Sequence, residues 1–287
     1  MEPRYGRFDR WSETATLERA RARELADFIE RRAQSEDEAS IRAAYLDLLQ
    51  INPDDRALDV GCGSGVVTRE LARRALPRGS VVGLDPSPHF LEIARELAKA
   101  TDLPDGLEFR LGDARALPLA EGEFDVTLAA TVLTHLPDGE RVVPELVRVT
   151  RPGGRVGIFD RDLDSFIVAH PDRELTRRIV LSFADHGAAN GLLSRRFPGL
   201  LREAGMVDVR VRGFTSLEQD PNSYYGQTCE LRAKTAAEAG AITAAERDRW
   251  LAALREEQEG GRFLAGMTYI FCWGTKPAGG IVPFQQA

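Results

Sequence analysis

Residues 57–65 read Ala-Leu-Asp-Val-Gly-Cys-Gly-Ser-Gly, an apolar stretch that runs into closely spaced glycines. Gly61, Gly63 and Gly65 can adopt backbone conformations that other residues resist, so the chain can approach a ligand closely. The free amides at the start of a following helix would favour an anionic group. Asp59, at the end of the apolar stretch, supplies a carboxylate that suits an ammonium group. A tight turn needed only for packing is the alternative interpretation.

Asp85 ends a second apolar stretch, Val81–Leu84. A carboxylate at a strand end about 20 residues after a glycine-rich turn is placed to accept hydrogen bonds from both hydroxyls of a ribose. Pro86 and Ser87 also suit the start of a helix, so a helix cap is the alternative. Both roles are compatible, with Asp85 binding a ligand and Ser87 capping.

A third strand is predicted to end at Gly112-Asp113-Ala114. The Asp113 carboxylate can accept a hydrogen bond from the exocyclic amine of adenine, and the small neighbours leave room for the ring. An exposed turn is the alternative for Asp113 taken alone. Three such strand ends in consecutive order along one sheet edge predict a ligand-binding crevice there.

Short apolar stretches alternate with helical stretches from residue 56 onward, which predicts an α/β fold with a mostly parallel sheet. Seven strands are expected, at 56–60, 80–84, 107–111, 124–129, 154–160, 206–214 and 267–274, with helices near 64–75, 88–100 and 139–150. Two amphipathic helices precede them, and Ser35 with Glu38 predicts a capping box on the second.

The segments 161–204 and 215–266 are too long for simple connections and are expected to form helical caps, one of them starting at a Thr243–Glu246 capping box. We therefore expect four regions: an N-terminal helical lid at 1–50, the binding core at 51–160, the rest of the core with its caps at 161–277, and a loose tail at 278–287.

The composition limits the kinds of partner and site that we expect for this chain. The 287 residues carry a net charge of −7, so the chain lacks the positive field that gathers nucleic acid. Cys62, Cys229 and Cys272 are far apart and no histidines cluster, so neither disulfides nor a metal site is expected. The N-terminus lacks an apolar signal region, and no stretch is apolar over the roughly 18 residues that span a bilayer. We expect a cytoplasmic protein that binds neither nucleic acid nor membrane; its oligomeric state is open, a homodimer included.

Together these motifs resemble those of the class I S-adenosylmethionine (SAM) methyltransferases, over roughly residues 40–160 and again at the last strand. The similar segments are 58–65, Asp85, 112–114, 124–136, 151–156 and 271–277. The sequence is most similar to the branch that contains ubiquinone/menaquinone and arsenite methyltransferases and many natural-product enzymes. It departs from the arsenite enzymes, because its scattered cysteines form no convincing thiolate trio.

The resemblance implies a seven-stranded Rossmann-like methyltransferase sheet with helices on both faces, and SAM as the cofactor, released as S-adenosylhomocysteine (SAH). The residues it assigns to SAM, from the methionine part through ribose and adenine to the sulfonium side, are Asp59, Gly61, Cys62, Gly63, Gly65, Asp85, Pro86, Ser87, Gly112, Asp113, Ala114, Ala130 and Thr131. The reaction would be an in-line displacement that depends largely on positioning.

His135 and Asp160 are the candidates for a base or electrostatic stabiliser at the acceptor. The alternatives are that His135 only packs or caps near Pro137 and that Asp160 belongs to a solvated loop. The residues expected to line the acceptor pocket are Tyr5, Trp11, His186, Tyr224 and Tyr225. For the N-terminal aromatic residues, packing onto the sheet is the alternative.

The function expected from the resemblance is methylation of C, O or N of a small metabolite, natural-product or quinone/isoprenoid-like. One alternative is an RNA or protein methyltransferase, although Ala129-Ala-Thr-Val replaces the Asn/Asp-Pro-Pro-Tyr/Phe tetrapeptide that amino-group methylation of bases would need. Another is a SAM-binding relative without methyl transfer, such as a cyclase or a regulatory protein. An NAD-dependent dehydrogenase is more distant, because the glycine spacing departs from G-x-G-x-x-G.

Overall fold

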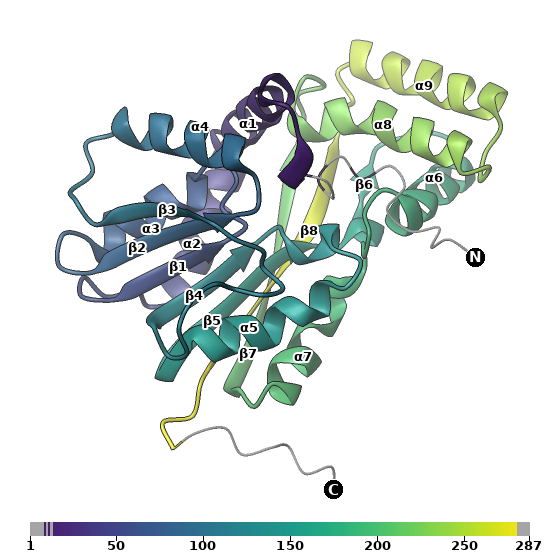
Figure 1. The fold of residues 1–287 in the computed structure, drawn as a ribbon. Coiled ribbons are helices and arrows are strands. Elements are labelled where there is room, and N and C mark those ends of the chain that lie inside the picture. Colours follow the sequence, from purple (N-terminus) through teal and green to yellow (C-terminus); the bar gives the residue numbers. More distant parts are fainter. Residues whose placement is uncertain (1–8, 10, 12–13, 280–287) are drawn as a thin grey trace, which may run out of the picture.

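The carboxyl ends of five parallel strands line one edge of the sheet in the computed structural model, which describes residues 9, 11 and 14–279. The strand order is β3-β2-β1-β4-β5-β8-β6, and β7 pairs with the outer side of β8 (Figure 1). The strands are β1 Arg56–Val60, β2 Ser80–Asp85, β3 Leu107–Leu111, β4 Phe124–Ala130, β5 Thr150–Arg161, β6 Ile167–Val168, β7 Val207–Glu218 and β8 Ala265–Thr275.

The seven expected strands are all present, and the eighth is β6, which has two residues and pairs antiparallel with β8. So short a strand has no alternation for a sequence pattern to detect. From β1 the chain builds outward to β2 and β3 and then returns to place β4 on the other side of β1. The strand order therefore reverses between β1 and β4, and open α/β sheets bind ligands at such a point.

Helices cover both faces of the sheet. On one face, the core contains buried side chains of α2 (Glu36–Leu48) and α3 (Val66–Ala75). On the other, it contains side chains of α5 (Val142–Val149) and α7 (Phe197–Glu203). The expectation of helices on both faces is therefore confirmed.

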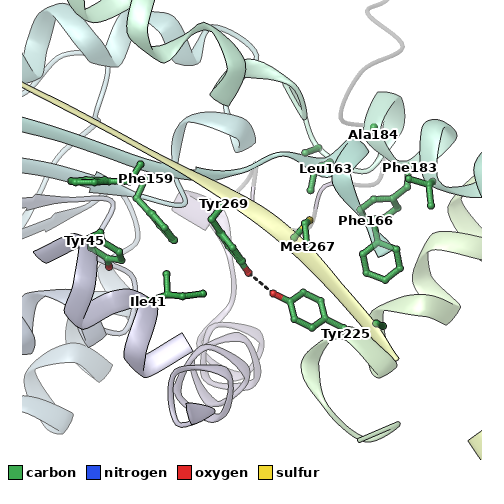
Figure 2. Close-up of a cluster of buried hydrophobic side chains, with 14 of the residues drawn as sticks. Ile41, Tyr45, Phe159, Leu163, Phe166, Phe183, Ala184, Tyr225, Met267 and Tyr269 are labelled. Carbon is green, nitrogen blue, oxygen red and sulfur yellow. Dashed lines mark hydrogen bonds between the residues drawn. The ribbon is translucent and has the colours of Figure 1, made fainter. Parts of the chain in front are cut away.

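Three further helices form the cap at the β6 end of the sheet: α6 (Arg173–His186), α8 (Tyr224–Glu238) and α9 (Ala244–Glu259) (Figure 1). The expected Thr243–Glu246 capping box starts α9. Buried aromatic side chains continue from the sheet into this cap, where the hydroxyls of Tyr225 and Tyr269 lie 3.1 Å apart (Figure 2). The cap and the sheet thus share one apolar core.

The N-terminal helix α1 (Arg19–Ala33) lies between α4 (Pro88–Lys99) and α8 (Figure 1). Its residues Ala22, Leu25 and Ala26 pack on Phe90 and Ile93 of α4. The capping box expected on α2 is half formed. The Ser35 hydroxyl accepts a hydrogen bond from the Glu38 amide, but the Glu38 carboxylate binds Arg32 (3.0 Å) and the Tyr269 hydroxyl (2.8 Å) instead of turning back. Contacts of Glu38 with Arg32 and Tyr269 therefore take the place of its expected bond to the Ser35 backbone amide.

None of the helices in the described part of the chain is both long and apolar enough to cross a bilayer. In the same residues, no three metal-ligating side chains come together, and all three cysteines are buried thiols without a disulfide.

Candidate active site

A cavity of about 260 Å³ lies at the carboxyl ends of β1, β2 and β4, where the strand order reverses. Ten of the thirteen residues assigned to the cofactor line it: Asp59, Gly61, Cys62, Gly63, Asp85, Pro86, Asp113, Ala114, Ala130 and Thr131. The other three, Gly65, Ser87 and Gly112, do not. Residues that follow β3 also line it, so the ends of β1, β2, β3 and β4 contribute to one cavity.

The glycine turn after β1 needs its glycines for three different reasons. Gly61, Gly63 and Gly65 all have positive φ, at +72°, +52° and +83°. A side chain on Gly61 would collide with Val132, and one on Gly65 would press on Phe109 under α4. A Cβ on Gly63 would meet only Ile29, at 3.4 Å, so this residue presents bare backbone to the cavity. Gly63 is therefore the position that lets a ligand approach.

Asp85 combines the two roles expected for it. One carboxylate oxygen accepts from the Gly63 amide and the other from the Ser87 amide, both at 2.9 Å. Ser87 in turn caps α4 by accepting from the Phe90 amide at 3.3 Å. Burial raises the pKa of Asp85 to about 6. This carboxylate shapes the glycine turn and still faces the cavity, where hydroxyl donors of a ligand would relieve its desolvation.

Asp59 is 1% exposed and accepts a hydrogen bond from the Thr68 hydroxyl at 2.6 Å. Burial, together with the neighbouring charge of Asp85, raises its pKa to about 7. A cation in the cavity would stabilise the ionised form of both carboxylates. The pair thus suits a ligand that carries an ammonium group.

Asp113 is held by a residue that the sequence interpretation missed. Arg115 donates from Nε to one carboxylate oxygen (3.0 Å) and from Nη2 to the other (2.8 Å), and these bonds lower the pKa of Asp113. Gly112 lies outside the cavity, and a side chain there would press on Leu84. Asp113 is therefore a fixed, ionised acceptor at the cavity wall.

Thr131 follows β4 with φ at +57°, a left-handed conformation that β-branched residues rarely adopt. Its amide donates to the Phe159 carbonyl at 2.6 Å, which holds the strained turn. Ala130 and Thr131 line the cavity beside Val132. Such strain persists only where the surroundings impose it, and it concentrates at functional sites.

His135 lies on the wall of the cavity within a buried polar chain. Its Nδ1 is 2.7 Å from a carboxylate oxygen of Asp9, and its Nε2 contacts Nη2 of Arg161. Arg161 can only donate, so Nε2 must be the acceptor and Nδ1 must carry the proton. Arg161 also donates to the Tyr224 hydroxyl at 3.2 Å. The alternative that His135 only packs or caps near Pro137 did not include this chain of polar contacts.

Asp160 does not line the cavity. It is fully buried, and its oxygens accept from the Thr134 amide (3.0 Å), the Thr134 hydroxyl (2.8 Å) and the Arg161 amide (2.9 Å). The arrangement corrects both expectations for Asp160: it is neither solvated nor aimed at an acceptor. Instead it fixes the loop that carries His135.

Two of the five residues expected in the acceptor pocket line the cavity: Trp11 and Tyr224. Phe28 lies between them, with ring centroids 6.4 Å from Trp11 and 5.4 Å from Tyr224. Tyr225 points into the core behind the cavity, since its hydroxyl meets that of Tyr269. His186 lies outside it and bonds the Ser182 carbonyl of its own helix. Tyr5 lies outside the described residues.

The sequence interpretation also missed Phe28, Arg32 and Arg161. Arg161 carried a signal, because it ends β5 at the same sheet edge as the predicted acids. Phe28 and Arg32 carried no such signal in the sequence, because nothing separates them from the other residues of an amphipathic helix.

The comparisons with known proteins agree with this geometry. A family model described as "Methyltransferase domain" matches residues 58–158. An uncharacterized 37.1 kDa protein in a transposon of Streptomyces fradiae is 33% identical over 84% of this chain and 68% of its own length. A demethylmenaquinone methyltransferase of Lactococcus lactis is 42% identical over 53% of this chain and 66% of its own length. This chain spans only about half of two other relatives: 49% of a demethylmenaquinone methyltransferase of Lactobacillus johnsonii and 55% of methyltransferase GfsG of Streptomyces halstedii.

Solved structures show the same fold. The YcgJ protein of Bacillus subtilis superposes with a TM-score of 0.56 at 16% identity, over 82% of this chain and 97% of that one. Phosphoethanolamine N-methyltransferase 2 of Haemonchus contortus, in complex with SAM, superposes with a TM-score of 0.51 at 18% identity. The match covers 83% of this chain and 52% of that one. With the glycine turn, the strand-end acids and the sequence matches, these likenesses identify the chain as a member of the class I SAM-dependent methyltransferases.

Proposed function

We propose that the protein transfers the methyl group of SAM to C, O or N of a small-molecule acceptor. The observation that carries this proposal is a single cavity that joins the glycine turn and strand-end acids to an aromatic wall made by Trp11, Phe28 and Tyr224. Aromatic side chains around a few polar groups are typical of small-molecule sites. A natural-product or quinone-like ring is the acceptor class that best suits that wall.

The residues present fit SAM. Gly63 offers backbone that no neighbouring side chain obstructs. Asp59 and Asp85 are buried carboxylates whose pKa values are raised, and a cation and hydroxyl donors would stabilise their ionised forms. We assign Asp59 and the turn to the methionine part, Asp85 to the ribose, and Asp113 with Ala114 to the adenine. Ala130 and Thr131 are assigned to the sulfonium side. When bound, SAM supplies an activated methyl group that an acceptor atom displaces in line.

The protein's own contribution is positioning and exclusion of water. The helix α1 covers the cavity through Phe28, Ile29 and Arg32, consistent with the lid expected of the N-terminal region. His135 is neutral with Nδ1 protonated, and Arg161 occupies its Nε2. His135 therefore accepts a proton from the acceptor only when Arg161 releases Nε2.

Calorimetric titration with SAM, SAH and NAD tests the proposal. Micromolar binding of SAM and SAH without NAD binding is expected, followed by methyl transfer to small acceptors from a metabolite panel. The Asp85→Ala variant should bind SAH weakly, whereas Asp54→Ala, at an exposed acid outside the cavity, should bind it normally. Binding of NAD alone would overturn the proposal. Tight SAH binding with no turnover on any acceptor would point to a cyclase or a regulatory protein.

A further inference from the structure

Arg232 of α8 is a buried cation that has no counter-ion among the residues the structure describes. Its side chain is 2% exposed, and the guanidinium carbon lies 3.7 Å from the ring centroid of Phe166 and 4.4 Å from that of Phe183. Both rings belong to the apolar cluster between sheet and cap (Figure 2). Within the described residues, no Asp or Glu forms an ion pair with Arg232.

The hydrogen bonds of Arg232 are weak. Nη1 donates to the Thr228 carbonyl at 3.4 Å, Nη2 contacts the Met267 sulfur at 3.9 Å, and the buried Nε has no hydrogen-bond partner in the described part of the chain. Burial lowers the pKa of Arg232, but a guanidinium remains charged in proteins. An unpaired buried charge is costly, and it persists where something else compensates it. Arg32, by contrast, has Glu38 as its counter-ion at 3.0 Å.

Arg232 faces a side pocket of about 30 Å³ that adjoins the main cavity. Four residues line both spaces: Trp11, His135, Arg161 and Tyr224. A water needs roughly 10–15 Å³ of such volume, so the side pocket has room for about two oxygen-sized atoms. That room matches the two oxygens of a carboxylate.

Two arginines face the side pocket. Arg161 and Arg232 both line it, and within the described residues neither buried Nε atom has a hydrogen-bond acceptor. Asp9 is the one acid among the lining residues described, and it is engaged with His135 at 2.7 Å. Asp160 pairs with Arg161, with a carboxylate oxygen 3.9 Å from Nε, so within the described residues Arg232 is the arginine of the two that lacks an acidic partner. An anionic group bound in the side pocket would supply that partner.

We propose that the methyl acceptor carries a carboxylate that docks in this side pocket on Arg161 and Arg232, with its apolar body against Trp11 and Phe28 in the main cavity. This inference rests on the proposed function and adds the substrate class, an amphipathic carboxylic acid. A carboxylate on Arg161 also competes with His135 Nε2 for the guanidinium, so that acceptor binding frees the base.

The test uses the full chain saturated with SAH, titrated with benzoate and decanoate and with their neutral amides, benzamide and decanamide. At least one acid should bind tenfold or more tightly than its amide. Equal binding of acid and amide in both pairs, or no binding of either acid, overturns the inference. Inorganic phosphate binding as tightly as the better acid overturns the carboxylate assignment.

Arg232→Met supplies the matched variant, because methionine keeps an apolar side chain between Phe166 and Phe183 without the charge. It should lose tenfold or more in affinity for the better acid and change SAH affinity less than twofold. Arg249→Met, at an arginine with 62% side-chain exposure, should change neither. Unchanged acid binding in Arg232→Met contradicts the inference, and if that variant does not fold, the wild-type titrations decide. Failure of wild type to bind SAH would instead refute the proposed function.

Discussion

Asp9 and His135 are 126 residues apart in sequence, yet a carboxylate oxygen of Asp9 lies 2.7 Å from Nδ1 of His135. Burial alone would raise the pKa of Asp9, but His135 and Arg161 lower it, so the carboxylate stays ionised. A carboxylate on Nδ1 fixes the ring and directs Nε2 toward Arg161 and the cavity. The N-terminal segment therefore completes a site whose other parts lie at the strand ends and on the cap.

Replacing His135 with alanine should leave SAH affinity within about twofold, because the ring's hydrogen bonds go to Asp9 and Arg161, neither of which is assigned to the cofactor. Turnover should fall about 10²-fold or more if the imidazole accepts the acceptor's proton. Single-turnover rates and SAH titrations of wild type and variant measure the two effects. Unchanged turnover would reduce His135 to a packing residue.

Asp85→Ala should weaken SAH binding by about 1–3 kcal/mol, because ribose hydroxyls lose their acceptor and the Gly63 amide loses its partner. Isothermal titration calorimetry measures the change. Asp85→Asn, which keeps an oxygen acceptor, should lose less. Equal SAH affinity in wild type and Asp85→Ala would show that the ribose lies elsewhere.

Gly63→Val should abolish SAH binding while the protein still folds. The new side chain would occupy the cavity wall, and the left-handed φ of +52° adds strain of about 1–3 kcal/mol. Circular dichroism should show native secondary structure with a lower Tm, and calorimetry should show no heat of SAH binding. Retained binding would mean that the ligand does not approach the turn at this residue.

Asp59→Asn should make the free protein more stable at pH 8 but not at pH 4. Burial raises the Asp59 pKa from 3.8 to about 7, so folding favours the protonated acid and wild-type stability falls as pH rises through that window. The variant avoids this cost, up to about 4 kcal/mol at roughly 1.4 kcal/mol per pH unit. Urea unfolding at both pH values measures the difference. A variant advantage that shrinks with rising pH would contradict the raised pKa.

The cofactor side of the site could be predicted because it follows from strand order. Parallel strands end at one edge, so Asp59, Asp85 and Asp113 had to lie near one another wherever the sheet formed. Gly65 and Ser87, which were also assigned to the ligand, lie outside the cavity at the starts of α3 and α4, and caps and binding residues use the same residue types.

The acceptor side could not be predicted in the same way. The contact between Asp9 and His135, and the burial of Arg232 between aromatic rings, depend on how the N-terminus and the cap close over the sheet. On a helix, an arginine is usually solvated, and no local pattern separates Arg232 from exposed Arg249. Asp160 was expected to meet the acceptor because it ends β5, but its side chain turns toward Thr134.

Asp160→Asn separates a positioning role from a catalytic one. The amide nitrogen of asparagine cannot accept from Thr134 or Arg161, so a buried donor loses its partner and stability should fall by about 1–3 kcal/mol. Turnover should fall because the loop carrying His135 loosens, but the pH dependence of kcat should keep its shape, since Asp160 does not reach the cavity. Denaturant unfolding and a pH–rate profile measure the two effects. Loss of a titrating limb in Asp160→Asn that His135→Ala retains would identify Asp160 as the base.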